Sequence, residues 1–278
     1  MTAPEDGDDA PGGAAAGAGE PPVPLVREGA LPPGLESVTR VVAVVAHPDD
    51  ESFGLGGVLG LLVDHGIAVD VLCLSHGEAS TLGAAEDLGE VRERELRHAA
   101  AVLGVDRVWL HGLPDGHLAT HGERIAYLVD RAVAGRDRAE PGGPGRAPGT
   151  ADAVVVFEPS GVTGHGDHVA ATEAALGVAR RRGLVSLEWG VPPAAARQLA
   201  AELAVPFSGL GGDDVVAVRV DRARQRAAVA CHRSQATGNP VLERRLALQG
   251  DVDHVRVRLP APRPPKDRTA LFPGPAPG

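Results

Sequence analysis

Short apolar runs alternate along this chain with segments of helical pattern, and that alternation constrains the fold more than any other feature. Strands are predicted at residues 38–46, 68–74, 107–110, 153–157, 215–220 and 253–259. Helices are predicted at residues 53–65, 88–103, 123–134, 168–182 and 221–232. Strands that alternate with helices are typical of βαβ units, whose strands pair in parallel. The sequence therefore predicts an α/β fold with a mostly parallel sheet covered by helices.

Composition supports one domain with a core of small and aliphatic side chains. Hydrophobic residues make up 43% of the 278 residues but aromatic residues only 3%, so the core must consist mainly of Ala, Val and Leu. A chain of this length suffices for one substantial α/β domain. Residues 1–30, rich in Ala, Gly, Pro and acidic side chains, are predicted to be a disordered tail. Residues 31–259 are the predicted single domain, and residues 260–278 a disordered Pro-rich tail.

Charge and cysteine content argue against several classes of protein. The formal net charge of −10 does not favour binding to nucleic acid or to an anionic membrane surface. We expect no membrane span and no signal peptide, because no segment has the required apolar pattern. The two cysteines, Cys73 and Cys231, are far apart, so we expect free thiols and a cytoplasmic protein. The oligomeric state stays open.

Two of the predicted strands end in clusters of His and Asp residues. The first strand leads into HPDDE at residues 47–51, and the fourth leads through a Gly-rich turn into HGDH at residues 165–168. Ligands of parallel α/β sheets bind beyond the carboxyl ends of the strands. We therefore expect both clusters at the ligand site.

A zinc site is the first chemistry that these residues suggest. Zn²⁺ binds imidazole nitrogens and carboxylate oxygens, and its catalytic sites use three protein ligands and a water. His47 and Asp50 lie three residues apart, so at the start of a helix they would point to one side. A histidine of the second cluster, such as His168, could complete the set. Fe²⁺ and Co²⁺ are alternatives for the same donor atoms.

Hydrolysis also requires a base and a partner for the developing negative charge. Asp49, beside the candidate ligands, could take the proton of the attacking water. His165 could face the tetrahedral intermediate or protonate the leaving amine, and Asp167 could orient His165 and raise its pKa. The two clusters together predict a metal-dependent hydrolase.

The motifs AHPDDE, at residues 46–51, and HGDH, at residues 165–168, resemble the hallmarks of the LmbE-like, PIG-L-type de-N-acetylase family. The resemblance extends over most of the chain, and AHPDDE at a strand end is its specific part. It implies a Rossmann-like fold with helices on both faces of the sheet. It also implies a divalent metal, usually zinc, and hydrolysis of the N-acetyl group of an N-acetylglucosamine-type conjugate.

Carried over by position, the resemblance assigns a role to each residue of the two clusters. The implied metal ligands are His47, Asp50 and His168. The choice of the last histidine over His165 comes from the resemblance. Asp49 is implied as the general base, His165 as the oxyanion partner or acid, and Asp167 as the partner of His165.

Weaker matches concern substrate contacts. Arg92 begins an RxxEL pattern and Asp115 lies in LPDG at residues 113–116, and the resemblance implies that both contact the sugar. The alternative interpretations are a solvated helix residue and a turn former. HRSQ at residues 232–235 resembles a common helix ending near the site, and packing, helix termination and substrate contact are all open for it. Gly166 departs from the family, in which Pro is frequent there.

Other functions compete with N-acetyl hydrolysis. A related zinc amidase would cleave a thiol–sugar amide with the same metal set. A nucleotide-binding oxidoreductase is suggested by the Gly-rich run at residues 54–57, but Leu59 stands where the dinucleotide fingerprint needs a third Gly. A binding protein without catalysis would have no need of Asp49 and His165. The sequence has no GxSxG or HExxH pattern, which argues against a serine hydrolase and a zincin.

Overall fold

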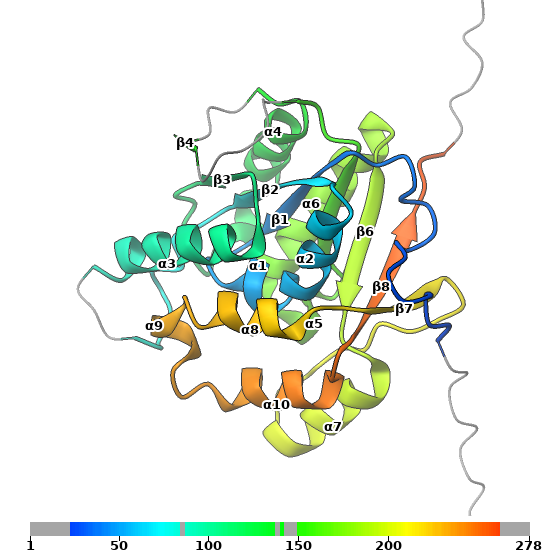
Figure 1. Cartoon of the computed structure of the whole chain (residues 1–278). Helices are drawn as coiled ribbons and strands as arrows, with labels where there is room; N and C mark the ends of the chain where they lie inside the picture. Colours follow the sequence, from blue (N-terminus) through cyan, green and yellow to red (C-terminus); the bar gives the residue numbers. More distant parts are fainter. Residues whose placement is uncertain (1–22, 84–86, 137–139, 142–148, 262–278) are drawn as a thin grey trace, which may run out of the picture.

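The computed structural model describes residues 23–83, 87–136, 140–141 and 149–261, and within these ranges eight strands form one sheet (Figure 1). The strand order is β4-β3-β2-β1-β5-β6-β8-β7. The strands are β1 (Arg40–Val45), β2 (Ala68–Cys73), β3 (Arg107–Leu110), β4 (Glu140–Pro141), β5 (Ala153–Phe157), β6 (Val185–Gly190), β7 (Val215–Arg219) and β8 (Val252–Arg258). The predicted α/β fold is confirmed.

The five strands β3, β2, β1, β5 and β6 are parallel, while β4 at one edge and β8 and β7 at the other pair antiparallel. The chain winds outward from β1 through β2 and β3, then returns to β5 on the other side of β1. Such a reversal opens a crevice at the carboxyl ends of the two neighbouring strands. The loops after β1 and β5, which carry the two His–Asp clusters, meet at this crevice.

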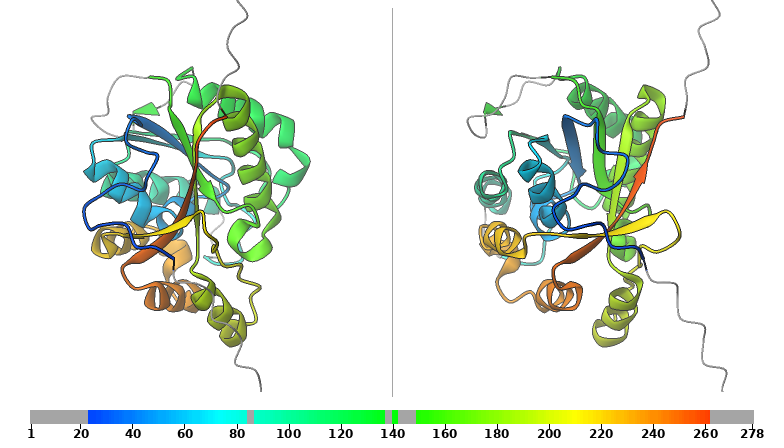
Figure 2. Two further views of the ribbon diagram at one scale, coloured as in Figure 1. Left: turned by 90° about the vertical axis from the view of Figure 1, so that its right-hand side faces the viewer. Right: turned by 45° about the vertical axis from the view of Figure 1, so that its right-hand side comes forward.

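Helices cover both faces of the sheet, as the family resemblance implied. The described helices are α1 (Asp50–Phe53), α2 (Gly56–Asp64), α3 (Leu88–Leu103), α4 (Gly122–Val133), α5 (Gly161–Gly164), α6 (Gly166–Arg182), α7 (Pro193–Leu203), α8 (Arg222–Val229), α9 (Arg233–Ala236) and α10 (Pro240–Gln249), with a 3₁₀ helix at Leu118–Thr120. Helices α2, α3 and α8 contact one another on one face, and α4 and α6 pack together on the other (Figure 2).

Strand β1 shows why this sequence needs a helix layer on each side. Val41, Ala43 and Val45 belong to the core under α2 and α3, whereas Val42 and Val44 belong to the core under α4 and α6. Successive side chains of a strand point to opposite faces, so a continuous apolar run requires two apolar layers. The predicted strand at residues 38–46 therefore becomes the centre of the sheet.

Strand β6 and helices α7 and α10 are among the described elements that were not predicted from the sequence. Strand β6 contains buried Ser186 and Glu188, which interrupt its apolar run. Arg258 Nε donates to Glu188 at 2.8 Å and Arg256 at 3.2 Å, both from the adjacent strand β8. Because the neighbouring strand supplies the opposite charge, the pattern of β6 alone does not indicate a buried strand.

A missed signal marks the start of α10. The Asn239 side chain accepts the backbone N–H of Leu242 at 3.0 Å, and Pro240 occupies the first turn. An Asn cap followed by Pro is a common helix start. Helices α7 and α10 contact each other and lie beyond the carboxyl ends of the parallel strands (Figure 1).

The N-terminal boundary of the domain lies earlier than predicted. The Val26 backbone N–H donates to Ala217 O at 2.8 Å, and the Ala217 N–H donates to Pro24 O at 2.9 Å. A start of the domain at residue 31 is therefore wrong, because the chain already pairs with β7 at residues 24–26. Residues 1–22 and 262–278, which make up most of the two predicted tails, lie outside the described residues.

The Gly-rich run after β1 has a packing role. A Cβ atom at Gly54 would overlap the Phe157 ring, and one at Gly57 would lie 2.7 Å from Asp253 Oδ2. Both glycines thus allow side chains of β5 and β8 to approach the backbone closely. The space around them is filled by side chains, which leaves the backbone no room to approach a pyrophosphate as a dinucleotide fingerprint requires.

Candidate active site

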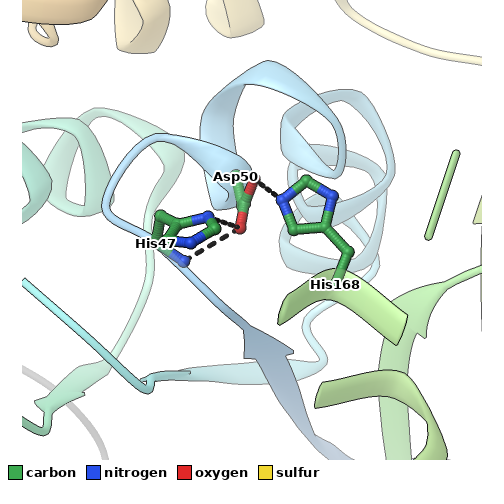
Figure 3. A group of neighbouring side chains, drawn as sticks. All are labelled: His47, Asp50 and His168. Atoms are coloured by element: carbon green, nitrogen blue, oxygen red, sulfur yellow. Dashed lines mark hydrogen bonds and ion pairs between the residues drawn. The ribbon is translucent and has the colours of Figure 1, made fainter. Parts of the chain in front are cut away.

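His47, Asp50 and His168 come together at the crevice between β1 and β5 (Figure 3). His47 and Asp50 follow the end of β1, and His168 lies in the first turn of α6. Asp50 Oδ1 is 3.2 Å from His168 Nε2, and Asp50 Oδ2 is 3.6 Å from His47 Nδ1. The three donor atoms lie within 4.8 Å of one another. Two imidazoles and a carboxylate at this spacing suit a divalent cation such as Zn²⁺.

Backbone groups hold the side chains of this group in place. The backbone N–H groups of Ala46 and His47 donate to Asp50 Oδ2 at 3.1 and 3.0 Å. His168 Nδ1 lies 3.2 Å from Gly161 O, which leaves Nε2 directed at Asp50. Burial raises the pKa of Asp50, but the charges of His168 and His47 outweigh it and hold that pKa well below its usual value.

The second nitrogen of His47 is held by carboxylates. Nε2 lies 3.0 Å from Asp115 Oδ1 and 3.3 Å from Asp167 Oδ2. A histidine that binds a metal through one nitrogen usually donates its other N–H to such a partner. Burial lowers the pKa of His47, but Asp115, Asp167 and Asp50 raise it well above its usual value. The surroundings of His47 therefore stabilise positive charge.

A second group with mutually close donor atoms comprises His47, His165 and Asp167. Both oxygens of Asp167 already accept backbone N–H groups, from Gly116 at 2.7 Å and Leu118 at 2.9 Å. The two backbone N–H groups at Asp50, in contrast, both donate to Oδ2, and Oδ1 faces His168. The group with Asp50 and His168 is therefore better suited to bind a cation.

The partner expected for Asp167 differs from the observed one. Its carboxylate contacts His47, Gly116 and Leu118, whereas His165 Nδ1 accepts the backbone N–H of Asp167, at 3.3 Å. The charge of Asp167 raises the pKa of His165, as expected, but it does not set the direction of the net shift. Burial, with the charges of His168 and His47, lowers that pKa. The Asp167 carboxylate is thus engaged with His47 and with the loop after β3, although one of its oxygens also lies within 4.8 Å of a His165 ring nitrogen.

Asp49 has an unusual backbone conformation, with φ of 137°. Non-glycine residues rarely adopt such angles, and neighbouring contacts must hold them. The Asp49 N–H donates to Glu51 Oε2 at 3.0 Å, and Arg92 Nη2 donates to Asp49 Oδ2 at 3.0 Å. Burial raises the pKa of Asp49 to about 7, against the opposing charge of Arg92. The candidate base is thus fixed in place beside Asp50.

Arg92 is buried, with 3% of its surface exposed, so it is not a solvated helix residue. Besides Asp49, its guanidinium donates to Gly77 O at 2.6 Å and Pro48 O at 2.7 Å. These contacts tie α3 to the loops after β1 and β2. Arg92 therefore positions Asp49, a role that the sequence did not indicate. Its contact with a sugar stays a prediction.

Asp115 is likewise more than a turn former. Besides His47, its carboxylate accepts the backbone N–H of Ala79 at 2.9 Å. Burial raises the pKa of Asp115, but the hydrogen bond and charge of His47 bring it down to about 2. Asp115 is therefore an anion bound to the candidate ligand His47, and its sugar contact also stays a prediction.

The HRSQ segment at residues 232–235 joins three parts of the site. His232 Nε2 lies 2.7 Å from Glu51 Oε1. Ser234 donates to Glu95 of α3 through its backbone N–H at 2.9 Å and its Oγ at 2.6 Å. Gln235 accepts from Ser80 Oγ at 2.7 Å. Glu51 of HPDDE and Glu95 of RxxEL had been given no role in the sequence analysis. Two acidic residues without a role could have indicated that other side chains, such as those of HRSQ, pair with them.

A cavity of about 360 Å³ brings the candidate residues to one surface. Its lining includes His47, Asp49, Asp50, Arg92, Asp115, His165 and His168. Asp167 lies behind this surface, buried beneath it. All but one of the residues selected from the sequence thus face one polar cavity, of a size that holds a small ligand.

The family model and two relatives that match this chain are described as de-N-acetylases or deacetylases. The PIG-L family, described as GlcNAc-PI de-N-acetylase, matches residues 42–179. A 1D-myo-inositol 2-acetamido-2-deoxy-alpha-D-glucopyranoside deacetylase from Corynebacterium glutamicum (strain R) is 31% identical over 223 residues, covering 69% of this chain and 75% of the relative. A probable N-acetylglucosaminyl-phosphatidylinositol de-N-acetylase from Schizosaccharomyces pombe is 28% identical over 155 residues, covering 52% of this chain and 53% of that relative. The chain thus spans about half the length of the latter protein.

Solved structures share the fold. A conserved protein from Thermus thermophilus aligns with a TM-score of 0.56 and 23% identity, covering 83% of this chain and 99% of that chain. At this identity the likeness concerns the fold alone. Among the described residues, none of the helices combines the length and apolar character that a membrane crossing requires.

Proposed function

Because the chain belongs to the PIG-L family, we propose that it is a metal-dependent hydrolase that removes the N-acetyl group from an N-acetylglucosamine-type conjugate. The observation that carries this proposal is the meeting of His47, Asp50 and His168 in one cavity, with Asp49 beside them. Relatives named as deacetylases of N-acetylglucosamine conjugates support the same reaction. The free thiols of Cys73 and Cys231 support the reducing cytoplasm as its place.

We propose Zn²⁺ as the metal and His47, Asp50 and His168 as its ligands. This donor set is that of catalytic zinc sites with three protein ligands. The chemistry that such a cation supplies is polarisation of the amide carbonyl and activation of water near neutral pH. Fe²⁺ or Co²⁺ would suit the same atoms, so metal analysis of the purified protein decides among them.

The residues of the chain would move the protons. Arg92 donates to Asp49 Oδ2, which leaves Oδ1 to take a proton from the attacking water. His165 Nδ1 accepts a backbone N–H, so the proton of its neutral ring is on Nε2, where it can be donated to the carbonyl oxygen or the leaving nitrogen. A C–O bond forms, the C–N bond breaks, and the nitrogen takes up a proton. The products are a carboxylate and a free amine.

An amidase that cleaves a thiol–sugar amide is the second candidate. The same residues would act on any amide placed at His47, Asp50 and His168. An apolar cavity that adjoins Asp50 and His168 favours an amide with an acyl group larger than acetyl. The two candidates differ in the acyl group released, so product analysis separates them.

The experiment that tests the function is acetate release from a panel of N-acetylated amino sugars. The metal-stripped full chain is compared with the same protein refilled with Zn²⁺, and Asp49→Asn is compared with Asp213→Asn, a change at an exposed residue outside the site. We expect acetate only with metal, and only from the wild type and Asp213→Asn. Acetate release by the metal-stripped protein would contradict the proposal.

A further inference from the structure

A second cavity, of about 370 Å³, adjoins the polar one. The two linings share Asp50, His168, Phe53, Leu82 and Asn239, so two of the three candidate metal ligands stand at the boundary between the cavities. The linings differ sharply in character. The walls that belong to the second cavity alone include Phe157, Val162, Trp189, Phe207 and Leu242, and Phe53 lines both cavities.

Aromatic side chains are concentrated at this cavity. The whole chain has four Phe and two Trp, and three of those Phe and one Trp line the cavity. Phe157 lies 5.5 Å from the Trp189 ring and 5.0 Å from the His168 ring, measured between centroids. In a chain with 3% aromatic residues, such a concentration beside the candidate ligands indicates a surface for an apolar ligand.

The backbone around the cavity is shaped to hold these walls. Gly54 lacks the Cβ that would overlap the Phe157 ring. Val162 has a φ of 69°, which is rare for a β-branched residue. Its N–H donates to Glu158 Oε1 at 2.8 Å, and its carbonyl accepts the Ser208 N–H at 2.7 Å. These contacts maintain Val162 in a costly conformation that places it on the cavity wall.

The guanidinium of Arg245, which also lines this cavity, already has partners. The Arg245 guanidinium lies 5.4 Å above the Trp189 ring and donates to Phe53 O and to Gln249. The polar cavity is lined by the charged side chains Asp49, Arg92 and Asp115. The polar cavity thus suits the hydroxyl-rich amine half of an amide, and the apolar one suits a hydrocarbon group.

We propose that the apolar cavity is the acyl subsite of this enzyme, and that it accepts amides whose acyl group is an apolar chain longer than acetyl. The inference rests on the proposed function, in which the scissile carbonyl lies at Asp50 and His168. From that point the amine half extends into the polar cavity, so the acyl chain enters the apolar one. An acetyl methyl, about the size of a water at roughly 30 Å³, would leave most of the 370 Å³ unused.

The chemistry is that of ordinary amide hydrolysis. Water adds its oxygen to the carbonyl carbon, the C–N bond breaks, and the nitrogen takes up both protons of the water and leaves as an ammonium group. The products are the free amino sugar and a carboxylate with its hydrocarbon chain. Each methylene buried in the cavity contributes up to about 0.8 kcal/mol, or roughly fourfold in kcat/KM.

The first test is a series of N-acyl glucosamines with acetyl, propanoyl, butanoyl and hexanoyl groups. Release of the primary amine is measured with the Zn²⁺-loaded full chain, since this product is common to the series. We expect kcat/KM to rise by about tenfold or more from acetyl to hexanoyl, below the limit set by full burial of each methylene. A fall in kcat/KM along the series would overturn the proposal.

A matched pair of variants on α10 locates the effect. Val241 lines the cavity, whereas Ala247 is exposed on the same helix. Val241→Phe should fill the cavity and lower the hexanoyl-to-acetyl ratio of kcat/KM by about tenfold. Ala247→Phe adds the same side chain outside it and should keep the wild-type ratio. Equal ratios in the two variants would contradict the assignment.

A binding measurement separates this inference from the proposed function, because it needs no turnover. Trp109→Phe leaves Trp189 as the sole indole, and Trp189 lines the cavity. We expect hexanoate to change its fluorescence and to bind about tenfold or more tightly than acetate, with the preference lost when Val241→Phe is added. Equal affinity for the two carboxylates would overturn the subsite even in an active deacetylase.

The alternative occupant of the apolar cavity is an apolar aglycone attached to the sugar. Octyl N-acetylglucosaminide tests this arrangement against N-hexanoylglucosamine. If the octyl glycoside gains in kcat/KM and Val241→Phe removes that gain, while the acyl series shows none, the cavity belongs to the aglycone and the acyl assignment is wrong.

Discussion

His232 Nε2 lies 2.7 Å from Glu51 Oε1, and both side chains are completely buried. Glu51 in turn accepts the N–H of Asp49, whose backbone has the rare φ of 137°. The buried pair therefore connects the HRSQ segment to the conformation of the candidate base. This contact gives the segment a positioning role within the site.

Removing one member of this pair should destabilise the protein and impair its chemistry together. We expect His232→Ala to lower the free energy of unfolding by about 3–5 kcal/mol, because it leaves Glu51 buried without its partner. His232→Gln, which keeps a donor near Glu51, should recover part of both stability and kcat. Urea unfolding and steady-state kinetics measure the two effects. Wild-type stability in His232→Ala would rule out this role.

The same pair predicts a dependence of stability on pH. Burial lowers the pKa of His232, but the charges of Glu51, Asp49 and Glu95 raise it above its usual value. A pKa raised in the folded state stabilises fully below the unfolded value of about 6.5, and this contribution is lost as pH rises through the folded pKa. The difference in free energy of unfolding between wild type and His232→Gln should therefore shrink with rising pH. Urea unfolding at several pH values checks this, and a constant difference would contradict it.

Metal affinity should depend on the carboxylates that hold His47. Asp115 Oδ1 lies 3.0 Å from His47 Nε2, opposite the nitrogen that faces Asp50. We expect Asp115→Asn to weaken Zn²⁺ binding by about 10–100-fold, since such partners orient the ligand and raise its basicity. Competition with a chelator measures the affinity, and Asp213→Asn serves as the control. Unchanged affinity in Asp115→Asn would remove this role.

Loss of the proposed ligand His168 should lower the metal content more than loss of the neighbouring His165. His168→Ala removes the imidazole whose Nε2 lies 3.2 Å from Asp50 Oδ1, so we expect no stoichiometric Zn²⁺ after dialysis. His165→Ala should retain the metal but lose turnover. Atomic absorption together with circular dichroism checks metal content and fold. The reverse outcome, with metal lost only in His165→Ala, would favour the group formed by His47, His165 and Asp167.

Asp49→Asn should separate catalysis from metal binding. The amide keeps the size of the side chain but cannot take a proton from water, so we expect kcat to fall by about 10²–10⁴-fold. Bound Zn²⁺ should remain, because Asp49 does not belong to the candidate ligand group. Metal analysis and amine release measure the two properties. Turnover near that of the wild type would exclude Asp49 as the base.

The sequence alone determined the central architecture and the principal site. Residues 38–46 and 153–157 are continuous apolar runs, and the HPDDE and HGDH motifs follow them within a few positions. Neighbouring parallel strands expose their carboxyl ends at one edge, so local patterns sufficed to predict that the two motifs meet, whereas the choice of His168 over His165 came from the family resemblance.

Only the tertiary structure decided which partner each polar side chain takes. His232 and Glu51 are 181 positions apart, and Asp167 contacts His47 where the sequence suggested His165. Strand β6 was missed for the same reason, because the arginines that neutralise Glu188 lie on β8. Such contacts depend on the packing of distant elements, which periodicity and spacing do not encode. Burial then fixes the pairing, since a buried charge must find a partner.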